Sequence, residues 1–180
     1  AQDTMPPQHP QVQGLQLRRD WRTRLNQVGQ LIKLGSQGRA ATMLEEMEKT
    51  GAPRVQTIPA WVALAASLDD HQTVADLCEE GLALNPRSPR LLRSYAMALM
   101  ALDRLDEADG ALGRLLAGSP NKTNVVIQAV DLWREGGHPE RGLALCASVR
   151  AAADGAPVLR PSRAACLFRL ERVEEAVAAV

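Results

Sequence analysis

The sequence has few aromatic residues, which make up 3% of its 180 positions, and its 21 basic residues are balanced by 21 acidic ones. A β-sandwich or barrel depends on β-branched and aromatic side chains, so this scarcity argues against an all-β fold. A nucleic-acid-binding module normally carries a basic surplus, and this chain has none. No apolar run approaches the roughly 20 residues of a bilayer-spanning helix. We therefore expect neither a nucleic-acid partner nor a direct membrane span.

Cysteine is also scarce. The chain contains Cys78, Cys146 and Cys166, an odd number that is too small for a disulfide scaffold of this length. Each lies in an apolar stretch with a helical pattern, where a buried free thiol acts as a small hydrophobic side chain. A single bridge between Cys146 and Cys166 stays open as the alternative.

Motifs of catalysis and cofactor binding are missing as well. The sequence contains no glycine-rich nucleotide loop, no H-E-x-x-H, no C-x-x-C and no G-x-S-x-G. His9 lies in the polar N-terminal stretch, and His71 and His138 lie in turns, where histidine is usually only solvated. We expect no catalytic residue, no metal site and no cofactor, so the chain is not expected to be an enzyme.

Alanine and leucine dominate the hydrophobic 46% of the sequence, and together with arginine, glutamate and glutamine they are strong helix formers. The composition therefore predicts an all-α fold. Residues 1–14 are polar and proline-rich, which predicts a disordered tail. This tail is similar to the segment that a signal peptidase leaves at a new N-terminus, so we expect a bacterial protein exported to the periplasm or beyond, with the cytoplasm as the alternative.

A stride of 34 residues runs through the chain. Small or β-branched residues recur at that interval, at Ala40, Val74, Ala108, Gly142 and Ala176. A turn precedes each of them, at residues 35–38, 68–71, 102–105, 136–139 and 170–173. Apolar stripes with spacings of three and four flank the turns, which indicates pairs of helices. We expect the small residues to be buried where two helices cross.

The stride and its residues resemble the tetratricopeptide repeat (TPR), a helix–turn–helix unit of 34 residues. Residues 89–122 match the family pattern best, with Leu92, Tyr95, Ala96, Leu99, Ala108, Leu112, Leu115 and Pro120 in its slots. The resemblance implies a right-handed α-solenoid of about five TPR-like units over residues 15–180. The units are expected at 21–54, 55–88, 89–122, 123–156 and 157–180, the last of them truncated.

In this family the first helices of the units line a concave groove that holds a peptide or a partner helix. In two units of this chain, the positions that correspond to this groove lining by helical spacing are Arg90, Arg93, Met97, Met100, Asn124, Ile127, Gln128, Asp131 and Arg134. Arginine binds carboxylates in a bidentate manner and methionine adapts to different partners. These residues predict a partner segment that carries acidic and apolar side chains. The alternative is that they only pair with one another, as Asp131 and Arg134 could at i,i+3.

Together these features predict a non-catalytic protein–protein interaction scaffold, in a periplasmic assembly, secretion or exopolysaccharide-export system. The alternative is a regulatory or scaffolding arm of a larger enzyme or outer-membrane transporter. The apolar run at residues 173–180 differs from the polar cap of a finished solenoid. It indicates a fragment of a longer repeat protein, and we expect this open end to be a place where copies of the chain can associate.

Overall fold

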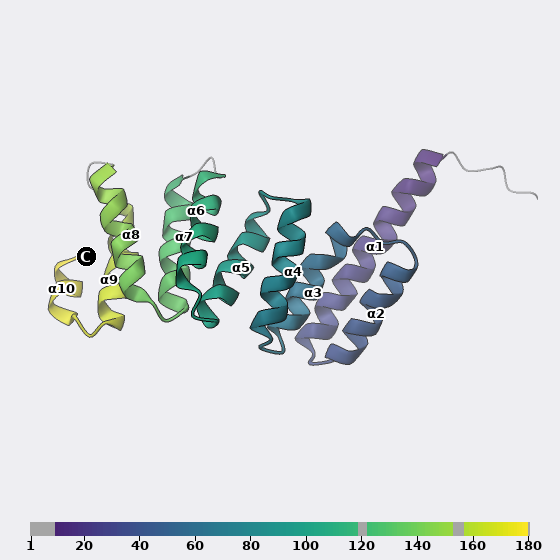
Figure 1. Cartoon of the computed structure of the whole chain (residues 1–180), viewed down its shortest axis with the longest axis horizontal. Coiled ribbons are helices and arrows are strands. Elements are labelled where there is room, and N and C mark those ends of the chain that lie inside the picture. The colour runs from purple at the N-terminus through teal and green to yellow at the C-terminus, as the bar shows by residue number, and fades with distance from the viewer. Residues whose placement is uncertain (1–9, 119–121, 153–156, 180) are drawn as a thin grey trace, which may run out of the picture. The chain divides into compact units, whose positions relative to one another are not determined.

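A computed structural model of the chain describes the backbone of residues 10–118, 122–152 and 157–179, and the side chains within 20–118, 123–148 and 158–179. Every regular element in these ranges is helical, which confirms the all-α prediction (Figure 1). The elements are α1 (Pro10–Lys33), α2 (Gln37–Lys49), α3 (Arg54–Ala66), α4 (His71–Leu84), α5 (Pro89–Ala101), α6 (Leu105–Ala117), α7 (Lys122–Glu135), α8 (Pro139–Ala152), the 3-10 turn η1 (Pro157–Leu159), α9 (Arg160–Arg169) and α10 (Val173–Ala178).

The first helix begins earlier than the sequence suggests. The expected tail covered residues 1–14, but α1 already starts at Pro10, so residues 10–14 belong to the helix. Proline is accommodated in the first turn of a helix because its missing N–H has no partner to lose there. Residues 1–9 of the expected tail lie outside the described residues.

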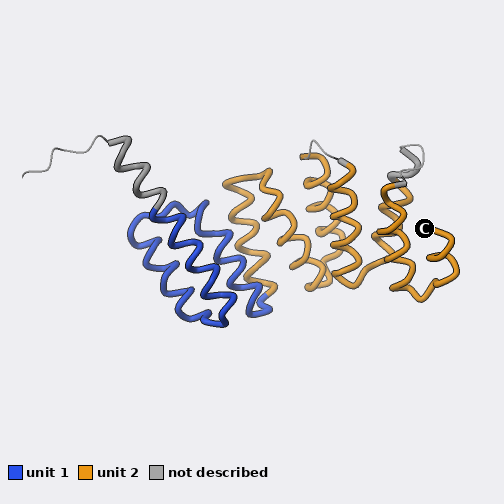
Figure 2. The backbone as a smooth tube through the Cα atoms, turned by 180° about the vertical axis from the view of Figure 1, so that it is seen from behind, with its two compact units in different colours: residues 1–70 blue, residues 71–180 orange. Residues whose placement is uncertain are grey.

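The chain divides into two compact units, residues 1–70 and 71–180 (Figure 2). In the first unit, α3 packs against both α1 and α2 over a core that contains Val28, Leu44 and Leu64. In the second unit, α5 packs between α4 and α6, and α7 and α8 pack against each other and against α9. The boundary at Asp70 falls in the turn of the expected repeat 55–88.

The first helix of each expected pair ends on a residue with left-handed backbone geometry. These residues, 34 positions apart, are Gly35, Asp69, Asp103, Gly137 and Glu171, with φ angles of 71°, 54°, 58°, 87° and 59°. In the third turn the Arg104 N–H donates to the Leu99 carbonyl at 2.8 Å, and the Asp103 N–H donates to the Met100 carbonyl at 3.1 Å. The same two bonds recur in the other four turns. This is the Schellman motif, which satisfies carbonyls that a helix end would leave without a donor.

Small residues follow each turn where the second helix crosses its neighbours. Ala40, Val74, Ala108 and Ala176 are buried, with exposed fractions of 0%, 3%, 0% and 7%, and Gly142 is buried as well. At Gly142 the crossing is tight, because a Cβ atom there would stand 3.1 Å from the Cys166 Sγ and 3.2 Å from the Val130 carbonyl oxygen. Helix α8 therefore packs against both α7 and α9 at a point where a side chain would require its neighbours to move by a few tenths of an ångström.

A carboxylate joins two helices of the first unit. The Glu48 Oε1 atom of α2 accepts hydrogen bonds from Arg54 Nη1 at 2.7 Å, Thr57 Oγ1 at 2.6 Å and Trp61 Nε1 at 2.9 Å, all on α3. Partial burial works to raise the pKa of Glu48, but these three bonds and the Arg54 charge outweigh it and lower that pKa below its usual range. Thr57 is fully buried, so this acceptor also satisfies a hydroxyl that water cannot reach.

The turn geometry predicts opposite effects at two equivalent positions. Gly137→Ala forces a Cβ into left-handed geometry and is expected to lower the free energy of unfolding by about 1–2 kcal/mol. Glu171→Gly removes the same strain from the fifth turn and is expected to raise it by up to about 1 kcal/mol. Urea denaturation followed by circular dichroism measures both. Equal effects of the two changes would contradict the assignment of strain.

A second pair of substitutions tests the helix crossing. Gly142→Ala is expected to destabilise the protein by about 1 kcal/mol, because crowding against Cys166 and Val130 exceeds the gain in helix propensity. Gly110→Ala is the matched control in the interior of α6, where a Cβ would meet nothing within 4 Å. It should stabilise by about 1 kcal/mol. Stabilisation by both changes in thermal melts would mean that the crossing is loose.

Candidate functional site

The predicted binding residues lie on α5 and α7 of the second unit. We call the exposed face of the first helices α5, α7 and α9 the first-helix surface. Arg90, Asn124 and Gln128 are exposed on it, while Arg93, Met97, Ile127, Asp131 and Arg134 are half-buried. Most of the predicted side chains are therefore accessible, and they come from two helices that pack against each other.

One hydrogen bond joins the two helices across this surface. The Arg93 Nη1 of α5 donates to the Gln128 Oε1 of α7 at 2.8 Å. It places the guanidinium of Arg93 between the helices rather than away from the protein. The side chains predicted on separate repeats thus meet in space.

The i,i+3 pair named in the alternative interpretation, in which these residues only pair with one another, also forms. Arg134 Nη2 lies 3.5 Å from Asp131 Oδ1, and 3.4 Å from an oxygen of the neighbouring Glu135. Both acidic partners are partly exposed, at 38% for Asp131 and 56% for Glu135. The Arg134 Nε–H is buried and has no hydrogen-bond partner among the described residues.

Two of the predicted binding residues, Met100 and Ile127, expose less of their side chains on the first-helix surface than expected. Met100 is only 3% exposed, because the backbone of Gly136 lies against it: a Cβ at Gly136 would be 2.5 Å from the Met100 Sδ. Its placement on an open surface is therefore corrected to a core position. Ile127 packs in part against the core formed around Val126 and Val130, so only part of its side chain can meet a partner.

Sequence reasoning missed two residues on α9 and the turn before it. Val158 is 53% exposed and Phe168 is 67% exposed. They stand 34 positions after Asn124 and Arg134, and α9 packs against α7, so they continue the first-helix surface. Extending the stride into the fifth unit would have found them. The surface thus has arginine and polar side chains on α5 and α7, and at α9 it has two exposed apolar side chains, Val158 and Phe168, on a segment that also carries Arg160, Arg163 and Arg169.

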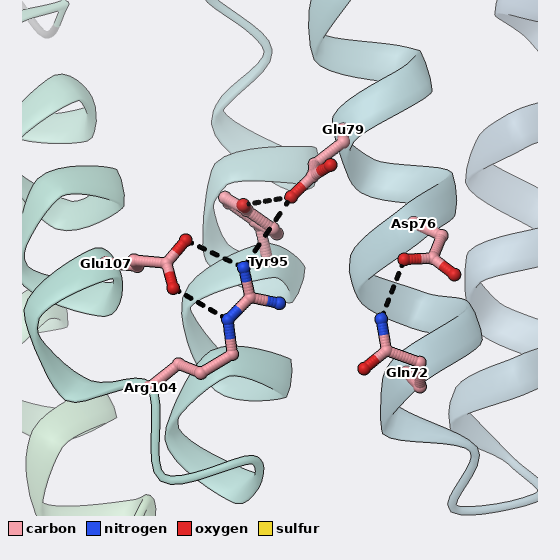
Figure 3. A network of polar contacts seen from close by, with 6 residues as sticks. All are labelled: Gln72, Asp76, Glu79, Tyr95, Arg104 and Glu107. Carbon is pink, nitrogen blue, oxygen red and sulfur yellow. Dashed lines mark hydrogen bonds and ion pairs between the residues drawn. The ribbon is translucent and has the colours of Figure 1, made fainter.

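A second polar cluster connects α4, α5 and α6 (Figure 3). The Tyr95 hydroxyl donates to Glu79 Oε1 at 2.6 Å, and Arg104 binds Glu107 through two contacts of 2.7 Å while lying 4.0 Å from Glu79. Burial raises the pKa of Tyr95 to about 12, and the hydrogen bond to Glu79 and its charge act in the same direction. A phenol held in its neutral form in this way serves as a hydrogen-bond donor that fixes α5 to α4.

The cysteines are buried. Cys78, Cys146 and Cys166 are buried free thiols. Burial raises the pKa of Cys78 to about 12 and that of Cys166 to about 11, so neither forms a thiolate near neutral pH. Within the described part of the chain, no three His, Cys, Asp or Glu side chains gather as metal ligands. Among the helices described, none combines the length and apolar character that a bilayer span requires.

The Tyr95 contact can be measured directly, because Tyr95 is the single tyrosine of the chain. Its ionisation, followed by the ultraviolet absorbance of tyrosinate, should have a midpoint near pH 12. An unfolded tyrosine ionises near about pH 10, so the stability that this contact provides is complete below about 10 and is lost as the pH rises towards the folded value. Glu79→Gln should lower the midpoint of the Tyr95 titration. Asp76→Asn is the control and should leave the midpoint unchanged, because Asp76 accepts a hydrogen bond from Gln72 and not from Tyr95. A wild-type midpoint near 10 would show that the contact is absent in solution.

Comparisons with known proteins bear on the fold. No protein-family model and no curated protein matches the sequence. Among the solved structures that match is a mutant of MamA, a TPR-containing protein, with a TM-score of 0.53 and 16% sequence identity. The match covers 89% of this chain and 95% of that one. At this identity the likeness concerns the fold alone, and it agrees with the regular turns and crossings described above. The chain therefore has an all-α solenoid fold of the TPR type.

Proposed function

We propose that the chain is a non-catalytic protein-interaction scaffold, and that the first-helix surface of residues 71–180 binds a partner segment with acidic and apolar side chains. The observation that carries this proposal is the continuity of that surface. Arg93 is bound to Gln128 across two helices, and the exposed Phe168 extends the same face onto a third. A TPR-type fold supports this role by analogy.

The α5 and α7 part of the surface suits carboxylates. Arg90, Arg93 and Arg134 place three guanidinium groups on the two helices, where Asp131 and Glu135 supply two carboxylates next to Arg134. Guanidinium groups bind carboxylates through paired, charge-assisted hydrogen bonds, which are roughly twice as strong as neutral ones. A partner that brings Asp or Glu side chains therefore gains specific contacts here.

The α9 part suits an apolar side chain. Phe168 and Val158 expose most of their surface to water, and covering them would stabilise a complex. Burial of one large apolar side chain contributes about 1.5–3 kcal/mol, which equals roughly a tenfold or larger gain in affinity. We infer that the partner segment runs across the first helices with its carboxylates towards α5 and its apolar residue towards α9.

The existing polar contacts do not oppose this binding mode. Ion pairs at partly exposed positions such as Asp131 and Arg134 contribute only about 0–1 kcal/mol to stability. A partner carboxylate can therefore replace or join them at little cost. The same contacts hold the arginine side chains near the surface before the partner arrives, which reduces the entropy lost on binding.

Cellular context stays a prediction. Export to the periplasm, with the cytoplasm as the alternative, is testable by fractionation of cells that express the full gene. Association of copies through the C-terminal end is supported by the exposure of Val173 and Val177, at 50% and 74%. Sedimentation velocity at several concentrations would show whether it occurs.

A selection from random peptides displayed on phage tests the proposed function. Peptides that bind the wild-type protein at this surface should be rich in Asp, Glu and large apolar residues. Affinities of the selected peptides, measured by fluorescence anisotropy, should fall about tenfold for Arg93→Ala and for Phe168→Ser. Added salt should weaken the wild-type complex, because the arginine contacts are exposed.

The matched control is Arg39→Ala, which removes an exposed arginine from α2 in the other compact unit. It changes the net charge as much as Arg93→Ala does, and it should leave the peptide affinity unchanged. Equal losses for the two variants would show that only overall charge matters. Full affinity in both Arg93→Ala and Phe168→Ser would exclude the first-helix surface as the binding site.

A further inference from the structure

A hollow lies on the second helices of the second unit. It is an open groove of about 460 Å³ between α6 and α8, the second helices of consecutive pairs, and we call it the α6–α8 groove. Its walls are Leu112, Gly113 and Leu116 of α6 and Ala144 and Leu145 of α8, and the indole of Trp133 from α7 forms its floor. Its size lies within the range of about 300–1,000 Å³ that is common for ligand sites.

The groove is open because side chains that would fill it are small. Gly113 is in the interior of α6, and a Cβ atom built on it would meet nothing within 4 Å. A glycine in a helix interior costs about 1 kcal/mol relative to alanine, and here no close packing offsets that loss. Ala144 on the facing helix is likewise small and exposed. The fold therefore keeps this space free at a cost in stability.

The groove has an apolar interior. Trp133 is 1% exposed, and Leu112 is 2% exposed, so the deepest surface is made of well-fixed apolar side chains. Leu116 and Leu145 are half-buried on the two sides. An aliphatic or aromatic side chain inserted between Leu116 and Leu145 would contact apolar surface and lose part of its contact with water.

One end of the groove carries negative charge. The guanidinium of Arg141 lies over the Trp133 ring, 5.4 Å from its centroid, and it is bound by Asp109 and, at 3.1 Å, by Asp106. Two carboxylates thus face one guanidinium, which leaves an excess of one negative charge. The Asp106 side chain is 97% exposed and Asp109 is 53% exposed, so a cation from solution can reach both.

We propose that the α6–α8 groove is a second binding site, which takes a partner segment with a bulky apolar side chain beside a lysine or arginine. The apolar side chain enters between α6 and α8 over Trp133, and the basic residue binds at Asp106 and Asp109. The charge preference is opposite to that of the first-helix surface. Where the proposed function also holds, the chain brings two different partners together on two faces. This inference concerns a separate surface and does not depend on the proposed function.

The same phage library provides the probe, and two glycines of α6 provide the variants. Gly113→Leu places a side chain in the groove, whereas Gly110→Leu places one on a neighbouring position that does not line it. Both positions have room for a Cβ, and leucine favours helix over glycine, so both variants should fold. Circular dichroism melts verify this before binding is measured.

Selection on the wild-type protein should yield a group of peptides that combine a large apolar residue with Lys or Arg. Their affinity should fall at least about tenfold in Gly113→Leu and change less than about twofold in Gly110→Leu. The double change Asp106→Asn with Asp109→Asn should weaken binding and reduce its salt dependence. Arg93→Ala should have no effect on this group, which separates the site from the first-helix surface.

Three results would overturn the proposal. The first is a selection in which every enriched peptide is acidic and depends on Arg93, which would support the first-helix surface alone. The second is an equal effect of Gly113→Leu and Gly110→Leu on the basic peptides. The third is concentration-dependent association of the wild-type protein that Gly113→Leu abolishes, because the occupant of the groove would then be a second copy of the chain.

Discussion

The left-handed residue that closes the first helix of each pair is the constraint on which the other features depend. It fixes where the chain reverses, and its two hydrogen bonds remove the need for water at the helix end. Because it recurs every 34 residues, every later feature of a pair also recurs, including the start of the second helix and the small residue at the crossing. Residues on the first helices consequently share one face in successive pairs, which is how Arg93 meets Gln128.

The turns, the helical spacing and the repeat period could be predicted because they depend on local sequence. Gly35, Asp103 and Gly137 are residue types that tolerate left-handed geometry, and the five turns lie where the sequence predicted them. The pair of Asp131 with Arg134 results from helical spacing alone. The TPR-type fold was likewise accessible from the stride, although no family model matches the chain.

Other features depend on contacts between elements and left no local signal. The burial of Met100 arises because Gly136, on the end of the next first helix, allows close approach. The α6–α8 groove results from side chains that are absent, such as that of Gly113, and its charged end needs α6 and α8 to be adjacent. The division of the chain at residue 70 was also not visible, since the turn there has the same geometry as the other four.

The three buried thiols have a consequence for how opening of the molecule could be followed. They lie on α4, α8 and α9, and the raised pKa values of Cys78 and Cys166 keep those two sulfurs protonated at neutral pH. An alkylating reagent reacts with a thiolate that it can reach, so labelling of any one cysteine must wait until its own helices separate. The rates at which the cysteines are labelled therefore report local unfolding separately at α4 and at α8 and α9 of the second unit.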